Sequence, residues 1–143
     1  MPLKIQNPEE MIEFSSESLD VTAQLINHLK SNDLLSYNWI LERLHYLKGN
    51  TAVAGFADLS DFIHQLEELC RIASQKAFAQ NFVRKELSKT INYLNSCYQQ
   101  IQKLDTYQTP KPFYEKIQSI IISADWIAEK ENTTSPNTTP NLP

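Results

Sequence analysis

Residues 45–56 read His45-Tyr46-Leu47-Lys48-Gly49-Asn50-Thr51-Ala52-Val53-Ala54-Gly55-Phe56, and this stretch contains both glycines of the 143-residue chain. Gly49 lies within a helical pattern, where glycine costs roughly 0.5–1 kcal/mol relative to alanine. His45 lies four positions earlier, one turn away on the same face of the predicted helix. A bare backbone beside a histidine leaves room for a partner protein to bring a reactive group to the imidazole. We therefore expect Gly49 to provide access to His45.

Apolar residues before and after this stretch recur at helical spacing. The helix that contains it carries a stripe of Tyr37, Ile40, Leu41, Leu44, Leu47 and Thr51. Gly55 suits the left-handed residue that ends a helix, with Phe56 as its hydrophobic contact. Asp33 is predicted to cap this helix and Asp58 the next one. The stripe of the next helix consists of Leu59, Phe62, Ile63, Leu66, Leu69, Cys70 and Ala73.

Three further helices are predicted. The first begins at Asn7-Pro8 and runs to about Lys30, and the polar pair Ser15-Ser16 allows a break within it. The fourth spans about residues 82–104, and the fifth follows Pro110 and Pro112 and spans about residues 113–130. The sequence thus predicts an all-α fold, an antiparallel four-helix bundle with an additional C-terminal helix. Residues 1–131 would form this domain and residues 132–143 a flexible tail or linker.

The composition excludes several classes of function. A net charge of −4 argues against a nucleic-acid partner, which requires a basic surface. No apolar run is long enough for a membrane span, and the N-terminus lacks a secretion signal. Cys70 and Cys97 have no metal-type spacing, so we expect reduced thiols, a cytoplasmic location and no cofactor. Two glycines cannot build a phosphate-binding loop, which excludes an autonomous kinase.

The helical pattern places several polar residues together. At about 100° per residue, His45 falls about 90° from the centre of its stripe, with Glu42, Gly49 and Ala52 on the same flank. Glu67 falls at a similar angle on the next helix, on the flank that also carries Ser60, His64 and Arg71.

Two helices that pack by their stripes would bring His45 and Glu67 together at the rim, half exposed, with Lys48 one turn along. A carboxylate that accepts Nδ1–H fixes the tautomer, directs Nε2 outward and stabilises the imidazolium that forms when Nε2 attacks. Lys48 would supply positive charge for a phosphoryl group.

The run His45-Tyr46-Leu47-Lys48-Gly49, followed by small residues, Gly55-Phe56 and another helix, resembles the signature of the histidine phosphotransfer (Hpt) domain. His64 and Glu67 make it most similar to the domain at the N-terminus of chemotaxis histidine kinases (CheA), over about residues 10–104. Thr51 departs from the pattern, because the family usually has a smaller residue there, and this affects packing more than chemistry. The fifth helix and the tail resemble the linker that follows this domain in chemotaxis kinases.

This resemblance implies that His45 accepts a phosphoryl group from a histidine kinase catalytic domain, or from a phosphorylated receiver, and passes it to an aspartate of a response regulator. Glu67 would orient His45, with Lys48 and His64 as electrostatic support. Glu42, Gly49 and Ala52 would face the partner. The chain would be a phosphorelay intermediate with neither a nucleic-acid nor a membrane partner.

Two alternatives remain open at this point. Glu42-x-x-His45 has the spacing of di-iron bundles, but that site needs a second Glu-x-x-His and two further glutamates. The chain offers only His64-x-x-Glu67, in reversed order, and Lys48 would place a cation beside the metal. The other alternative is a bundle of the same fold that acts as a binding or inhibitory module and accepts no phosphate.

Overall fold

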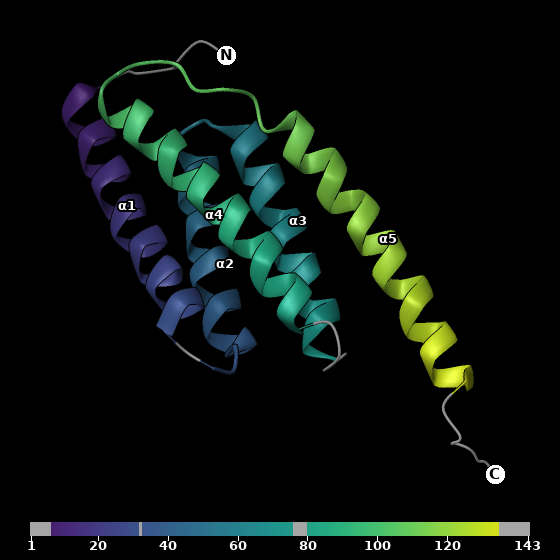
Figure 1. The fold of residues 1–143 in the computed structure, drawn as a ribbon. Coiled ribbons are helices and arrows are strands. Elements are labelled where there is room, and N and C mark those ends of the chain that lie inside the picture. The colour runs from purple at the N-terminus through teal and green to yellow at the C-terminus, as the bar shows by residue number, and fades with distance from the viewer. Residues whose placement is uncertain (1–6, 32, 76–79, 135–143) are drawn as a thin grey trace.

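The computed structural model describes residues 7–31, 33–75 and 80–134, with side chains as far as Ser123, and these residues form five α-helices and no strand. In chain order the helices are α1 (Pro8–Ser31), α2 (Tyr37–Val53), α3 (Ala57–Ser74), α4 (Gln80–Gln102) and α5 (Lys111–Thr134). Successive helices run in opposite directions, and α5 lies on the outside along α3 (Figure 1). This arrangement confirms the prediction of an antiparallel four-helix bundle with an additional C-terminal helix.

The C-terminal helix is longer than the sequence predicts. It begins at Lys111, so Pro112 lies in its first turn, where a backbone N–H has no helical partner in any case. It continues through Thr134, beyond the predicted start of the tail at residue 132. The rest of the predicted tail, residues 135–143, lies outside the described residues. None of the helices, as far as the structure describes them, is long and apolar enough to cross a membrane.

The predicted apolar stripes form the core. α1 packs mainly on α4, α2 packs mainly on α3, and α5 adds its contacts to the outer side of α3. The side chains with no exposed surface include Leu25, Ile40, Leu44, Leu47, Phe62, Leu66, Leu87, Leu94 and Tyr98. The α2–α3 and α1–α4 pairs form the two most extensive interfaces between helices. Close packing of α2 on α3 therefore holds the polar residues at the rim of that interface in a defined register.

The turn between α2 and α3 is the one that Gly55 was predicted to make. Gly55 has a φ of 98°, in the region that favours glycine. Its N–H donates to the Ala52 carbonyl, and the Phe56 N–H donates to the Thr51 carbonyl, each at 3.0 Å. This is the Schellman pattern of a helix end. Phe56 is then buried between the helices, so the turn fixes where α3 begins.

Two predicted N-caps are wrong. α2 begins after Ser36 rather than Asp33, because Leu35 is drawn into the core and its N–H donates to Gln80 Oε1 at 2.6 Å. α3 begins after Phe56, so Asp58 lies inside the first turn. Its Oδ1 accepts from the Leu59 N–H and from the Tyr107 hydroxyl, both at 2.8 Å. In both cases a buried apolar residue sets the first turn of the helix.

The break allowed at Ser15-Ser16 does not occur, because α1 is continuous. Ser15 is fully buried, and its hydroxyl donates to the Ile12 carbonyl at 3.0 Å. Thr22 makes the same kind of bond to Leu19 and also accepts from Asn95 of α4. Hydroxyls that bond to their own helix can be buried without interrupting it.

Thr51, the departure from the resembled pattern, is accommodated in the core. It is fully buried, and its hydroxyl lies 2.8 Å from the hydroxyl of Tyr98 on α4. Burying either hydroxyl without a partner would cost about 1–3 kcal/mol. The pair therefore satisfies both groups and links α2 to α4.

We expect both cysteines to resist alkylation in the folded protein. Burial raises the pKa of Cys70 to about 12 and that of Cys97 to about 11. At pH 8 an ordinary thiol is about one-quarter thiolate, whereas a pKa of about 11 leaves about one part in a thousand. Iodoacetamide should therefore react more than a hundredfold more slowly with the native protein than with the protein in guanidinium chloride. Rapid labelling of the native protein would show that these thiols are not buried.

Candidate functional site

The C-terminal half of α2 presents His45 and Lys48 at the edge of the bundle. Leu44, Leu47 and Thr51 on the same helix are fully buried, so packing fixes the backbone that carries the two polar residues. The side chain of His45 is 74% exposed and that of Lys48 is 24% exposed. His45 is thus more open than the half-exposed position that the sequence predicts, and a reacting group can approach its ring from solvent.

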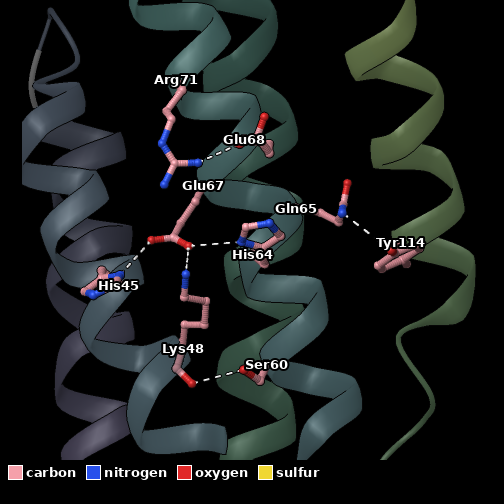
Figure 2. Close-up of polar contacts among 9 residues, drawn as sticks. All are labelled: His45, Lys48, Ser60, His64, Gln65, Glu67, Glu68, Arg71 and Tyr114. Atoms are coloured by element: carbon pink, nitrogen blue, oxygen red, sulfur yellow. Dashed lines mark hydrogen bonds and ion pairs between the residues drawn. The ribbon is translucent and has the colours of Figure 1, made fainter.

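α3 contributes a buried carboxylate to the same place. The Glu67 side chain is only 1% exposed, yet three ionisable side chains converge on it (Figure 2). His45 Nδ1 lies 3.3 Å from Oε2, Lys48 Nζ lies 2.6 Å from Oε1, and His64 Nδ1 lies 3.6 Å from Oε1. Burying a carboxylate without cationic partners is costly, so this cluster accounts for an acid inside the α2–α3 interface.

The contact between His45 and Glu67 determines which ring nitrogen is available. An ionised carboxylate only accepts hydrogen bonds, so Nδ1 of His45 must carry the proton that it donates to Oε2. The lone pair is then on Nε2, at the far side of an exposed ring. The arrangement therefore offers a nucleophilic nitrogen to solvent, with a carboxylate behind it to stabilise positive charge on the ring.

Lys48 contacts Oε1, the carboxylate oxygen that His45 does not reach. Its ammonium makes an ion pair with Oε1, but this contact does not have the geometry of a hydrogen bond, and among the described residues that oxygen accepts no hydrogen bond. Ser60 of α3 donates to the Lys48 backbone carbonyl at 3.1 Å and so ties the two helices together one turn away. Ser60 was placed on this flank by the sequence, but nothing in the spacing indicated this bond, which depends on the register between the helices.

Gly49 leaves open space next to His45. A Cβ atom built on Gly49 would meet nothing within 4 Å, and the residue is exposed within an unbroken helix. Ala52 is also exposed, so small residues lie one and two turns beyond His45 on the same flank of α2. On the other side of His45, Glu42 is 77% exposed and lies 3.7 Å from Arg43. Glu42, Gly49 and Ala52 thus lie on the flank of α2 that carries His45, as the sequence predicts.

The two histidines of the site lie on an open surface, because their side chains are 74% and 51% exposed. A hollow of about 440 Å³ lies nearby, between the first half of α1 and the end of α2, and it is lined by residues such as Glu13, Phe14 and Val53. None of His45, Lys48, His64 and Glu67 lines it. An open, shallow site suits a macromolecular partner better than a small molecule, which needs a concave site.

The described residues contain no group of three or more histidine, cysteine, aspartate or glutamate side chains placed to hold a metal ion. The Glu42-x-x-His45 pair does not share a metal site with His64. Nδ1 of both His45 and His64 is instead directed at Glu67. Lys48 occupies the remaining side of the same carboxylate.

The family model for the Hpt domain matches residues 10–104, which are two-thirds of the chain and include α2, α3 and α4 with most of α1. No curated protein and no solved structure matches the chain. The match leaves out α5, which the structure nevertheless packs against α3.

Proposed function

The chain belongs to the Hpt domain family, whose members carry out histidine phosphotransfer in two-component signalling, and from this premise we propose that His45 is its phosphoryl acceptor. One observation carries the proposal. The His45 side chain is 74% exposed, yet its Nδ1 lies 3.3 Å from the buried carboxylate of Glu67. The other two histidines differ, since His28 is half-buried and His64 lies farther from the carboxylate, at 3.6 Å.

The chemistry that follows is an in-line displacement at phosphorus. Nε2 of His45 attacks the phosphoryl group, a nitrogen–phosphorus bond forms, and the bond to the leaving oxygen breaks. The ring becomes positively charged and keeps its proton on Nδ1, where Glu67 Oε2 stabilises it. Attack by a carboxylate on the same phosphorus then reverses these changes and regenerates the neutral imidazole. The Lys48 ammonium pairs with the buried carboxylate of Glu67 and adds positive charge near the phosphoryl group.

We propose two protein partners, a histidine kinase catalytic domain as donor and a receiver domain of a response regulator as acceptor. Both must bring a reacting group within bonding distance of Nε2, and the bare surface at Gly49 and Ala52 allows this approach. The presence of both His64 and Lys48 beside Glu67 favours the variety of domain found in chemotaxis kinases. Because such a kinase uses ATP, we place the chain in the cytoplasm.

The test is chemical as well as enzymatic. The chain should acquire one base-stable, acid-labile phosphate from a panel of histidine kinase catalytic domains with labelled ATP, and phosphate of the same stability should form on His45 with phosphoramidate. Phosphohistidine has this stability profile, whereas an acyl phosphate is labile in base. A folded chain that takes no phosphate from either source would instead be a binding or inhibitory module.

Replacing Glu67 with glutamine should slow phosphorylation of His45 by about tenfold or more, the scale of losing an orienting group. A neutral amide can donate as well as accept, so it no longer holds the proton on Nδ1. The ¹⁵N shifts of the His45 ring should therefore change from one tautomer to a mixture. Glu68→Gln is the matched control, because Glu68 is the adjacent acid and pairs with Arg71 instead. An unchanged tautomer in the Glu67 variant would remove Glu67 from the mechanism.

A further inference from the structure

We propose that His64 is a second phosphoryl acceptor, which takes a phosphoryl group on its Nε2 from small phosphoramidate donors. The inference rests on the chemistry proposed for His45, because both imidazoles face the same carboxylate. Each ring turns Nδ1 toward a different oxygen of Glu67, His45 toward Oε2 and His64 toward Oε1. The close-up shows the two rings on opposite sides of the carboxylate, one from α2 and one from α3 (Figure 2).

The position of His64 leaves its outer nitrogen accessible. It lies on α3 one turn before Glu67, and its side chain is 51% exposed. Nδ1 is the ring nitrogen that lies near the carboxylate, at 3.6 Å from Oε1, so the negative charge favours the proton on Nδ1 and the lone pair on Nε2 without a hydrogen bond of the kind that His45 makes. His64 therefore has the two features that make His45 a nucleophile: an oriented ring and access from solvent.

The same contacts indicate that His64 is the slower acceptor. Its Nδ1 lies 3.6 Å from Oε1, which is beyond hydrogen-bond distance, whereas His45 lies at 3.3 Å from Oε2. Oε1 also faces the Lys48 ammonium at 2.6 Å, so less of its negative charge is available to the His64 ring.

The step balances without any further reactant. Nε2 of neutral His64 attacks phosphorus, the nitrogen–phosphorus bond of phosphoramidate breaks, and ammonia leaves with the electron pair of that bond. The ring carries one positive charge, with the proton on Nδ1 beside Glu67 Oε1, until water removes that proton. Nothing is oxidised or reduced.

The third histidine of the chain serves as an internal control. Nε2 of His28 accepts a hydrogen bond from the Ser36 N–H at 3.1 Å, and its ring stacks on Trp39 with the centroids 4.7 Å apart. An engaged lone pair cannot attack phosphorus while the fold is intact. We therefore expect His28 to stay unmodified in the folded chain and to react only when the chain is unfolded.

The experiment treats the full chain with potassium phosphoramidate at neutral pH and follows it by intact mass and by ³¹P NMR in base. His45→Gln should still take up one phosphate, several times more slowly than the wild type takes up its first but faster than N-acetylhistidine. The double variant His45→Gln, His64→Gln should take up none. Adding Glu67→Gln to His45→Gln should reduce the remaining rate by about threefold or more.

Each other outcome overturns the inference. Equal labelling of His45→Gln and of the double variant would exclude His64 as an acceptor. If His45→Gln is labelled only as fast as N-acetylhistidine, His64 reacts like any exposed imidazole and the site does not assist it. If Glu67→Gln leaves the rate of phosphorylation of His64 unchanged, the carboxylate does not orient that ring. The proposed function is tested separately with the single variant His64→Gln. If phosphoramidate leaves His45 unlabelled in that variant, the proposed function is wrong.

Discussion

A chain in which His45 is replaced by glutamine is expected to lose phosphoryl transfer from a kinase domain by at least about a thousandfold, because removing a nucleophile removes the bond-forming step itself. Glutamine keeps a polar side chain of similar length but has no basic nitrogen to attack phosphorus. Because the His45 side chain is 74% exposed, the free energy of unfolding should change by no more than about 0.5 kcal/mol. Label incorporation from ATP and a urea unfolding curve measure the two quantities on the same preparation.

The matched control for this experiment is His28→Gln, which removes a histidine of α1 that stacks on Trp39 near the start of α2. His28 contacts Trp39 and Ser36, so its loss can lower stability, but transfer per folded molecule should stay at the wild-type level. If His45→Gln is labelled by the kinase as fast as the wild type, His45 is not the acceptor and the proposed relay is wrong.

The helices could be predicted from the sequence because each carries a continuous apolar stripe. Ile40, Leu44, Leu47 and Thr51 of the α2 stripe are buried, Leu41 is partly buried, and the turn at Gly55 has the predicted backbone. The starts of α2 and α3 could not be predicted in the same way. They depend on the burial of Leu35 and Phe56 against residues that are distant in the sequence, and an acidic residue nearby is only a local signal.

The sequence was sufficient to predict which flank of each helix contributes to the candidate site. Placing His45 and Glu67 at similar angles from their stripes was enough to expect them at a shared rim, and the structure has them in contact. The sequence could not predict that Glu67 Oε2 contacts His45 whereas Oε1 contacts Lys48 and His64. This arrangement depends on the axial register of α2 against α3, which the Ser60 bond to the Lys48 carbonyl helps to hold. A shift of one turn would leave Lys48 and Glu67 apart while preserving both stripes.

Replacing Gly49 separates access to the site from stability of the fold. Since a Cβ on Gly49 meets nothing within 4 Å, Gly49→Ala should raise the free energy of unfolding by up to about 1 kcal/mol, through higher helix propensity and a less flexible unfolded chain. Gly55→Ala is the contrast, because a φ of 98° strains any side chain and should make that variant less stable. Chemical denaturation of the three proteins measures these differences.

Gly49→Gln should fold like the wild type, yet accept phosphoryl groups from a kinase domain and donate them to a receiver about a hundredfold more slowly or worse. The long side chain would occupy the space one turn from His45 that a partner protein must enter. Phosphoramidate is small enough to reach Nε2 from other directions, so its reaction with His45 should change by less than about threefold. Ser119→Gln, at an exposed position of α5, should leave all three rates unchanged. Equal losses with phosphoramidate and with the proteins would mean that Gly49 acts on the imidazole itself, and unfolding of Gly49→Gln would mean that it acts on packing.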